Sequence, residues 1–360
     1  MKQKLDYIPN DLVSLYDYER YAKERMSLNS LAYVCSGAGD ELTYKSNEKS
    51  FQKIFLETKT LEDLSHANTN IQLFGKNYET PIFIAPVAYQ KLVDIDGEIA
   101  TAQAANAMNS CMIVSSFSSS TFDDITKYTN SPLWFQLYIQ PDMNVNLELI
   151  KKVEQLGYEA LVITIDAPIS GIRNVEQRMG FFLPDGISAI NIKNPFQTTD
   201  NFENIFDIVQ YLPTWKDIEY LKKNTKLPVI LKGITSVSYA KKALDLGIDG
   251  IVVSNHGGRT LDTLPASIEL LPKIAKVINK KIPILFDGGI RRGTDVLKAI
   301  ALGANAVLIG RPIIYGLATA GALGVAHTLK ILKEELEVSM IFTGCKDIQS
   351  IDETILVQWI

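Results

Sequence analysis

The sequence predicts an α/β protein built as a (β/α)8 barrel. From residue 81 onward, eight short runs rich in Val and Ile alternate with amphipathic stretches, which is the pattern of repeated βα units. The glycines after the last two runs are typical of phosphate-binding turns. Together with the eight alternations they favour a closed barrel over the competing architecture, a doubly wound open sheet. At 360 residues, one barrel domain spanning 1–360 accounts for the whole chain.

The individual elements follow from the same pattern. The expected strands are 81–87, 111–116, 133–139, 160–166, 227–233, 250–256, 283–289 and 306–311. Helical patterns lie between them, for example at 96–108, 147–157, 238–247 and 293–303, and each ends near a residue that stops helices. Two regions depart from the repeat. We expect residues 1–80 to form a mostly helical extension capping the barrel, and residues 167–213 to form a mobile lid after the fourth strand.

Composition limits the partners of this chain. Its 46% hydrophobic and 21% charged residues indicate a soluble globular protein, and its net charge of −5 argues against a nucleic-acid surface. The three cysteines lie far apart without metal-ligand spacing, so we expect no metal site. We find no apolar signal segment, no membrane-length apolar run and no peroxisomal tripeptide. We therefore expect a cytoplasmic protein with small-molecule partners and no membrane.

The segment SNHGGRTLD, residues 254–262, carries the strongest chemical signal. It ends an apolar strand with His256, a residue that can accept a proton, at the end of the barrel where such enzymes keep their chemistry. Gly257 and Gly258 let the backbone approach a ligand, and Arg259 offers a planar cation suited to a carboxylate. A lone histidine at this place could equally be structural. The residues at the other strand ends distinguish a structural from a catalytic histidine. The remaining histidines, His66 and His327, lie away from strand ends and are interpreted as structural.

Polar groups stand at nearly every strand end. Burying them without partners would cost about 1–3 kcal/mol each, so the mouth must face water or a polar ligand. The last two ends, FDGGIRRGTD and LIGRP, place Arg291, Arg292 and Arg311 beside glycines just before helices, which predicts a phosphate cradle.

These motifs resemble one family, the FMN-dependent α-hydroxy acid oxidising enzymes, which include glycolate oxidase, lactate oxidase, lactate monooxygenase and mandelate dehydrogenase. The resemblance covers nearly the whole chain, because APVAYQ, WFQLY, TIDAPISGIR, ILKGI, SNHGGR, FDGGIRRG and GRP follow in the family's order. One departure is visible, where Val93, Asp94 and Ile95 replace the family's usual Ala-His-Pro. It affects local packing and leaves the catalytic set intact.

The resemblance implies roles for the residues around the substrate. His256 would be the base, Asp166 would hold and polarise its ring, and Tyr138 would lie by the substrate hydroxyl. Arg173 and Arg259 would bind the substrate carboxylate, with Tyr33 as a further hydrogen-bond donor.

The resemblance also implies FMN as the cofactor. Lys232 would lie against the flavin's pyrimidine edge. Ala88, Ser115, Gln136 and Thr164 would contact the isoalloxazine, Asp287 the ribityl hydroxyls, and Gly289, Arg291, Gly310 and Arg311 the phosphate. Pro86, Val87, Ser254 and Gly288 complete the expected cofactor-binding set.

The implied reaction oxidises a small L-2-hydroxy acid, lactate-like, to the 2-oxo acid, with molecular oxygen reoxidising the flavin to give hydrogen peroxide. A soluble dehydrogenase or a lactate monooxygenase would use the same site, and a flavin barrel isomerase or a non-catalytic binder is a more distant alternative. Beside Phe117 and Ser170, a bulky Tyr89 favours a small substrate side chain if its ring points inward. On the resemblance alone we expect a homotetramer or octamer.

Overall fold

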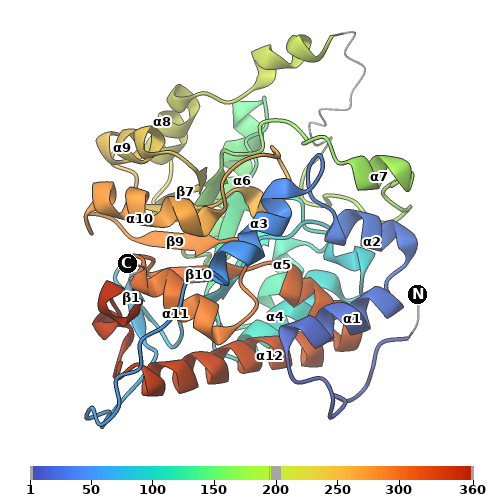
Figure 1. Cartoon of the computed structure of the whole chain (residues 1–360). Helices are drawn as coiled ribbons and strands as arrows, with labels where there is room; N and C mark the ends of the chain where they lie inside the picture. Colours follow the sequence, from blue (N-terminus) through green and yellow to red (C-terminus); the bar gives the residue numbers. More distant parts are fainter. Residues whose placement is uncertain (1–2, 194, 196–203, 358–360) are drawn as a thin grey trace.

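The fold is a closed barrel of eight parallel strands surrounded by helices, as seen in a computed structural model that describes residues 3–193, 195 and 204–357 (Figure 1). The strands are β3 (Ile82–Ile84), β4 (Met112–Ser115), β5 (Leu133–Leu137), β6 (Leu161–Thr164), β7 (Val229–Ile234), β8 (Gly250–Val253), β9 (Ile284–Asp287) and β10 (Ala306–Ile309). Each lies within one of the eight predicted strands or overruns it by a single residue. The predicted barrel is therefore confirmed.

The barrel strands read as continuous apolar runs because both of their faces are covered. Every residue of all eight strands is buried, between the barrel interior and the ring of helices. The sheet closes where β10 pairs in parallel with β3, with Val307 opposite Ile82. All strand C-termini consequently meet at one mouth.

A helix follows each strand of the barrel. These helices are α4 (Gly97–Ala107), α5 (Phe122–Thr126), α6 (Met143–Gln155), α8 (Trp215–Lys223), α9 (Val237–Asp245), α10 (Ser267–Ile278), α11 (Gly293–Ala301) and α12 (Arg311–Phe342). Short 3-10 turns are η1 (Gln90–Leu92), η2 (Ile205–Tyr211), η3 (His256–Gly258), η4 (Ile348–Ser350) and η5 (Glu353–Ile355). The four helices predicted by range are confirmed at α4, α6, α9 and α11.

The last helix, α12, was not predicted from the sequence. Among the described residues it is the one helix long and apolar enough to cross a membrane, but 78% of its apolar window is buried inside the protein. It packs against α1 (Leu15–Arg25), α4 and α11 (Figure 1). Its backbone is non-helical at Ala320 and Gly321. The helix is thus placed as a core helix of the barrel.

The N-terminal extension differs from the prediction. Helices α1, α2 (Leu28–Cys35) and α3 (Leu42–Phe51) are present, but residues 71–78 form an antiparallel hairpin of β1 (Ile71–Leu73) and β2 (Lys76–Tyr78). Its turn residues Phe74 and Gly75 both have positive φ, 50° and 77°, as a two-residue hairpin turn requires. The Phe74 and Tyr78 rings pack on Trp134 of β5. The expectation of a mostly helical segment up to residue 80 was therefore wrong.

The long connection after β6 begins directly on the loop that carries Arg259. A Cβ at Gly171 would lie 2.2 Å from the carbonyl oxygen of Thr260, so only glycine permits this approach. Helix α7 (Asn174–Arg178) follows and packs against α2. Part of the predicted lid, residues 194 and 196–203, lies outside the described residues, and its mobility stays a prediction.

Candidate active site

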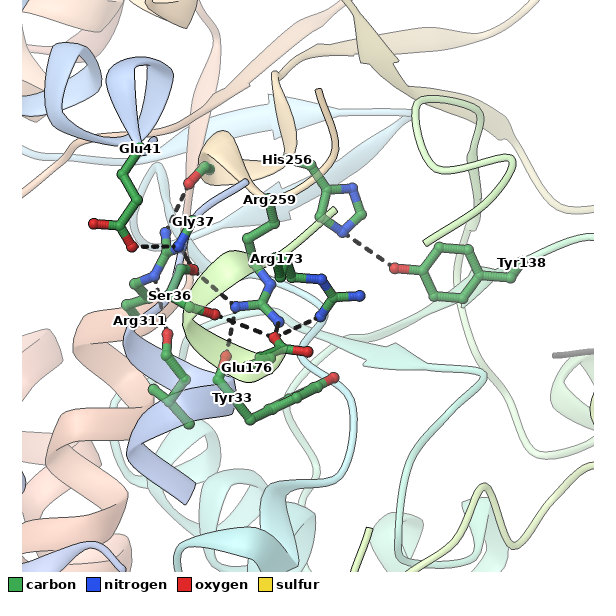
Figure 2. Close-up of polar contacts among 12 residues, drawn as sticks. Tyr33, Ser36, Gly37, Glu41, Tyr138, Arg173, Glu176, His256, Arg259 and Arg311 are labelled. Atoms are coloured by element: carbon green, nitrogen blue, oxygen red, sulfur yellow. Dashed lines mark hydrogen bonds and ion pairs between the residues drawn. The ribbon is translucent and has the colours of Figure 1, made fainter. Parts of the chain in front are cut away.

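The predicted base lies at the barrel mouth between an aspartate and a tyrosine. Asp166 follows β6, Tyr138 follows β5 and His256 follows β8. His256 Nδ1 lies 2.8 Å from Asp166 Oδ1. On the other side of the ring, His256 Nε2 lies 3.2 Å from the Tyr138 hydroxyl (Figure 2). The structure therefore brings the three predicted catalytic residues together.

The charges and burial around Asp166, Tyr138 and His256 indicate which of these side chains carry a proton. Burial disfavours the charged form of Asp166, but the charge of His256 when its ring is protonated, the charge of Lys232 and the hydrogen bond from His256 outweigh it, so the Asp166 pKa is lowered. Burial raises the pKa of Tyr138, which therefore stays protonated and donates to His256 Nε2. The Asp166 carboxylate accepts the Nδ1 proton. Nε2 is then the ring atom left to accept a proton.

The backbone around the base is held in an uncommon geometry. His256 itself has φ 58°, a left-handed value that costs free energy for a residue with a side chain. Gly233, at φ 105°, would place a Cβ only 2.4 Å from the Cβ of Asp166. Glycine at residue 233 is consequently what lets β7 pass beside the carboxylate. The sequence reasoning did not single out Gly233.

Two arginines face the base from one side of the same mouth. Arg259 Nη2 lies 3.1 Å and Arg173 Nη1 lies 2.8 Å from one oxygen of Glu176, Oε1 (Figure 2). The Arg259 guanidinium also lies over the Tyr33 ring, 4.8 Å from its centroid, and donates to the Tyr33 carbonyl oxygen at 2.5 Å. Burial and the nearby charge of Arg173 lower the pKa of Arg259 to about 10, so it is charged at neutral pH. A buried pair of like charges favours an anion between them.

Glu176 is a site residue that the sequence reasoning missed. It lies on α7, where its Oε1 also accepts a hydrogen bond from the Ser36 hydroxyl at 3.1 Å. Arg173 is the residue just before α7, and the spacing of three residues from it to Glu176 was the available, weak signal.

A cavity that is partly open to solvent runs from this mouth toward the ends of β9 and β10. Its wall includes Pro86, Val87 and Ala88, as predicted for the cofactor. Lys232 lines it and is 4% exposed, with Nζ 3.0 Å from Asp287 Oδ2 and 3.0 Å from the Ser254 hydroxyl. Burial lowers the pKa of Lys232, but Asp287 and Asp166 more than reverse this, so its pKa is raised and the ammonium stays charged.

The far end of the cavity contains two of the three predicted cradle arginines. Arg291 is buried and pairs with Glu48 at 2.7 Å. Arg311 donates to the backbone carbonyl oxygens of Val34, Ser36 and Gly257. Gly288, Gly289 and Gly310 also line this end. The three glycines and the two arginines are brought together as predicted.

The prediction that Arg292 belongs to the phosphate cradle is wrong. Arg292 is not among the lining residues. It bonds Glu335 at 2.8 Å, with its side chain 43% exposed. Consecutive residues in extended backbone point in opposite directions, and Arg292, at φ −137°, is extended. Arg291 therefore turns inward and Arg292 outward.

Three predicted flavin contacts lie deeper than the cavity wall. The Ser115 hydroxyl donates to Gln136 Oε1 at 2.9 Å, and Gln136 Nε2 donates to the Thr164 hydroxyl at 3.0 Å. All three residues are buried at the ends of β4, β5 and β6 and do not line the cavity. Their contact with a cofactor stays a prediction.

A second cavity shares His256 and Arg259 with the first, is also lined by Arg173, and has a wall of aromatic rings. It is lined by Tyr33, Tyr89, Phe117, Tyr138 and Phe181, among others. Tyr89 and Phe117 are stacked with centroids 6.1 Å apart. The ring of Tyr89 therefore points inward.

The other histidines lie away from both cavities, as predicted. His66 has φ 65° in a turn, and His327 Nδ1 lies 2.9 Å from the Tyr18 hydroxyl on α1. Within the described residues, no group of three His, Cys, Asp or Glu side chains could hold a metal ion.

The chemistry of the first cavity fits a phosphorylated redox cofactor. Asp287 Oδ1 and Arg291 Nε are buried polar atoms without a hydrogen-bond partner in the described structure. A hydroxyl and an anion respectively would satisfy them. Lys232 supplies a positive charge to the wall of this cavity. Gly288 and Gly289, which also line it, have positive φ, at 109° and 85°. The fold and site thus define a barrel enzyme that binds a phosphorylated cofactor beside a base and an anion clamp.

Comparison with known proteins gives the family. A family model described as FMN-dependent dehydrogenase matches residues 22–358. A 2-hydroxyacid oxidase of Dictyostelium discoideum is 43% identical, covering 96% of this chain and 90% of that protein. An L-lactate oxidase of Nostoc sp. is 40% identical, covering 96% and 98%. A crystal structure of mandelate oxidase with benzoyl-formic acid has a TM-score of 0.88 and 38% identity, covering 96% and 98%. The chain belongs to the FMN-dependent dehydrogenase family, among its 2-hydroxy acid oxidases, and its cofactor is FMN.

Proposed function

We propose that this enzyme oxidises a small, lactate-like L-2-hydroxy acid to its 2-oxo acid and transfers the electrons to molecular oxygen, which gives hydrogen peroxide. The observation that carries the proposal is that His256, Arg173 and Arg259 line one cavity. A carboxylate held by the arginines places the α-carbon of the substrate toward Nε2 of the base.

Each residue then has a defined task. Arg173 and Arg259 bind the substrate carboxylate, and Tyr33 borders the same space. His256 takes a proton from the substrate at Nε2, and Asp166 stabilises the imidazolium that forms. The protonated Tyr138 hydroxyl hydrogen-bonds the substrate hydroxyl and orients it.

FMN, when bound, accepts the two electrons that leave the α-carbon. Lys232 would lie against its pyrimidine edge and stabilise negative charge there. Asp287 would hold the ribityl hydroxyls, while Gly289, Arg291, Gly310 and Arg311 would hold the phosphate. The cofactor would be bordered by Pro86, Val87, Ala88 and Gly288. Further contacts with it would come from Ser115, Gln136, Thr164 and Ser254.

The aromatic wall supports a small substrate side chain. Tyr89 and Phe117 point into the substrate cavity, so a bulky group on the α-carbon would meet their rings. Two relatives at 40% identity are named L-lactate oxidase, from Nostoc sp. and from Alicycliphilus denitrificans. Of these two observations, the aromatic wall is the one that favours lactate over mandelate.

Anaerobic mixing tests substrate and acceptor together. The flavoprotein is mixed with L-lactate, glycolate or L-mandelate while flavin absorbance is followed, and oxygen is then admitted. We expect bleaching fastest with L-lactate and rapid recovery with peroxide formation. Slow recovery would indicate a dehydrogenase, and no bleaching by any acid would overturn the proposal.

Assembly and location are also proposals. On the family resemblance we infer a homotetramer or octamer, and we keep the expectation from the sequence that the protein is cytoplasmic. Light scattering of the purified protein and fractionation of cells that produce it test the two statements separately.

A further inference from the structure

Two loops carry the aromatic wall of the substrate cavity. Tyr89 lies in the loop after β3 and Phe117 in the loop after β4. The Tyr89 N–H donates to the Phe117 carbonyl oxygen at 3.1 Å, and the two rings stack. Loops have little order of their own, so their spacing depends on what ties them together.

A buried carboxylate lies behind both loops. Glu98, in the first turn of α4, is 0% exposed. Its Oε1 accepts from the backbone N–H of Gln90 at 3.1 Å and of Ser119 at 2.9 Å. Its Oε2 accepts from the hydroxyls of Ser119 and Ser120, each at 2.9 Å. Glu98 thus binds donors from both loops at once.

The hydrogen-bond directions around Glu98 are fixed. The Ser119 hydroxyl oxygen already accepts from the Lys91 N–H at 3.1 Å, so its proton is directed to Glu98. Every donor lies within three residues of Tyr89 or Phe117 in the chain. Burying a carboxylate is costly unless all of its acceptors are used, and here four donors use them.

We propose that Glu98 is a positioning residue that fixes the spacing of Tyr89 and Phe117 and thereby selects the size of the substrate side chain. This rests on the proposed function, because it concerns the same cavity. Releasing the carboxylate leaves four donors unpaired and allows the two loops to separate. The penalty against longer side chains then falls.

The test is a selectivity ratio measured on the FMN-loaded enzyme. We compare kcat/KM for L-2-hydroxyhexanoate with kcat/KM for L-lactate in wild type, Glu98→Gln and Glu98→Ala. We expect the ratio to rise about threefold in the glutamine variant and about tenfold in the alanine variant, the range that small changes in an apolar pocket produce.

Glu159 provides a matched control at the opposite end of the barrel. It lies just before β6, where it pairs with Lys76 at 2.8 Å and accepts from the Tyr78 hydroxyl. Glu159→Gln and Glu159→Ala remove a hydrogen-bonded carboxylate that is 20% exposed and far from the substrate cavity, and their ratios should stay within about twofold of wild type. A general loss of stability would move both pairs of variants alike.

The outcomes are distinguishable. If Glu98→Ala does not fold, the selectivity ratio is measured in Glu98→Gln and in Ser120→Ala, which removes a single donor. An unchanged ratio in folded, active Glu98 variants overturns the positioning role and leaves the proposed function standing. A wild-type enzyme inactive toward every 2-hydroxy acid overturns both.

Discussion

Replacing Asp166 by asparagine tests the link between the aspartate and the base most directly. Asparagine keeps the shape of the side chain but removes the charge that faces His256 Nδ1 at 2.8 Å. At an effective dielectric constant of about 20, opposite charges at this separation attract by about 6 kcal/mol, an upper limit because the full charges are spread over several atoms. The lower limit is one charged hydrogen bond, about 1.5–3 kcal/mol. We therefore expect Asp166→Asn to lower kcat/KM for L-lactate by about 10- to 10⁴-fold.

The assay is anaerobic flavin reduction as a function of L-lactate concentration. The apparent substrate dissociation constant should change by less than about threefold, because Arg173 and Arg259 do not contact residue 166, and the loss should fall on the limiting reduction rate. Asp166→Ala should be no less impaired than Asp166→Asn. A reduction rate within about fivefold of wild type in the asparagine variant would refute the idea that this carboxylate stabilises the charged base.

Four other perturbations follow from the same geometry. Glu176→Gln removes the charge that both arginines share, and we expect KM for L-lactate to rise about tenfold with little change in kcat; a fall in KM would mean instead that Glu176 competes with substrate. Gly233→Ala should lower kcat/KM at least tenfold and the unfolding free energy by about 1–3 kcal/mol, because its Cβ meets Asp166. Gly157 also has positive φ, but an added Cβ would have no atom within 4 Å. Gly157→Ala should therefore lower stability without lowering kcat/KM. Tyr89→Ala should raise the ratio of mandelate to lactate turnover about tenfold, and an unchanged ratio would place the ring outside the substrate's reach. Asp166 has a lowered pKa, so its stabilisation is complete above its unfolded value of about 3.9 and is lost as pH falls through the folded value. The difference in unfolding free energy between wild type and Asp166→Asn should therefore shrink as the pH falls below about 3.9.

Most of the barrel could be predicted because each strand leaves its own pattern in a short stretch of sequence. Parallel strands covered on both faces produce uninterrupted apolar runs, and eight such runs leave few architectures. The convergence of His256, Asp166 and Tyr138 follows from that topology alone, since all three stand after strand C-termini. The hairpin at 71–78 also had a local signal, two short runs separated by Phe-Gly, that the expectation of a helical extension overrode.

What could not be predicted depends on contacts between distant segments. Whether Arg291 or Arg292 enters the cavity depends on the phase of an extended backbone. Glu98 and Glu176 look like ordinary solvated charges of helix first turns until the loops and arginines around them are placed. Gly233 reads as any strand-end glycine, and its reason appears only when Asp166 packs against it.

The seam of the barrel has a consequence for how the enzyme is made. β10 closes the sheet against β3, and the residues just past each of these strands, Gly310 with Arg311 and Ala85 with Pro86, border the same cavity. A ribosome must release the chain past Arg311 before the two sides of that cavity can meet. FMN loading is consequently a late event in biosynthesis, and a cofactor bound across the seam fastens the first strand to the last. Cells short of riboflavin should therefore accumulate a chain whose barrel opens and is degraded more readily than the loaded enzyme.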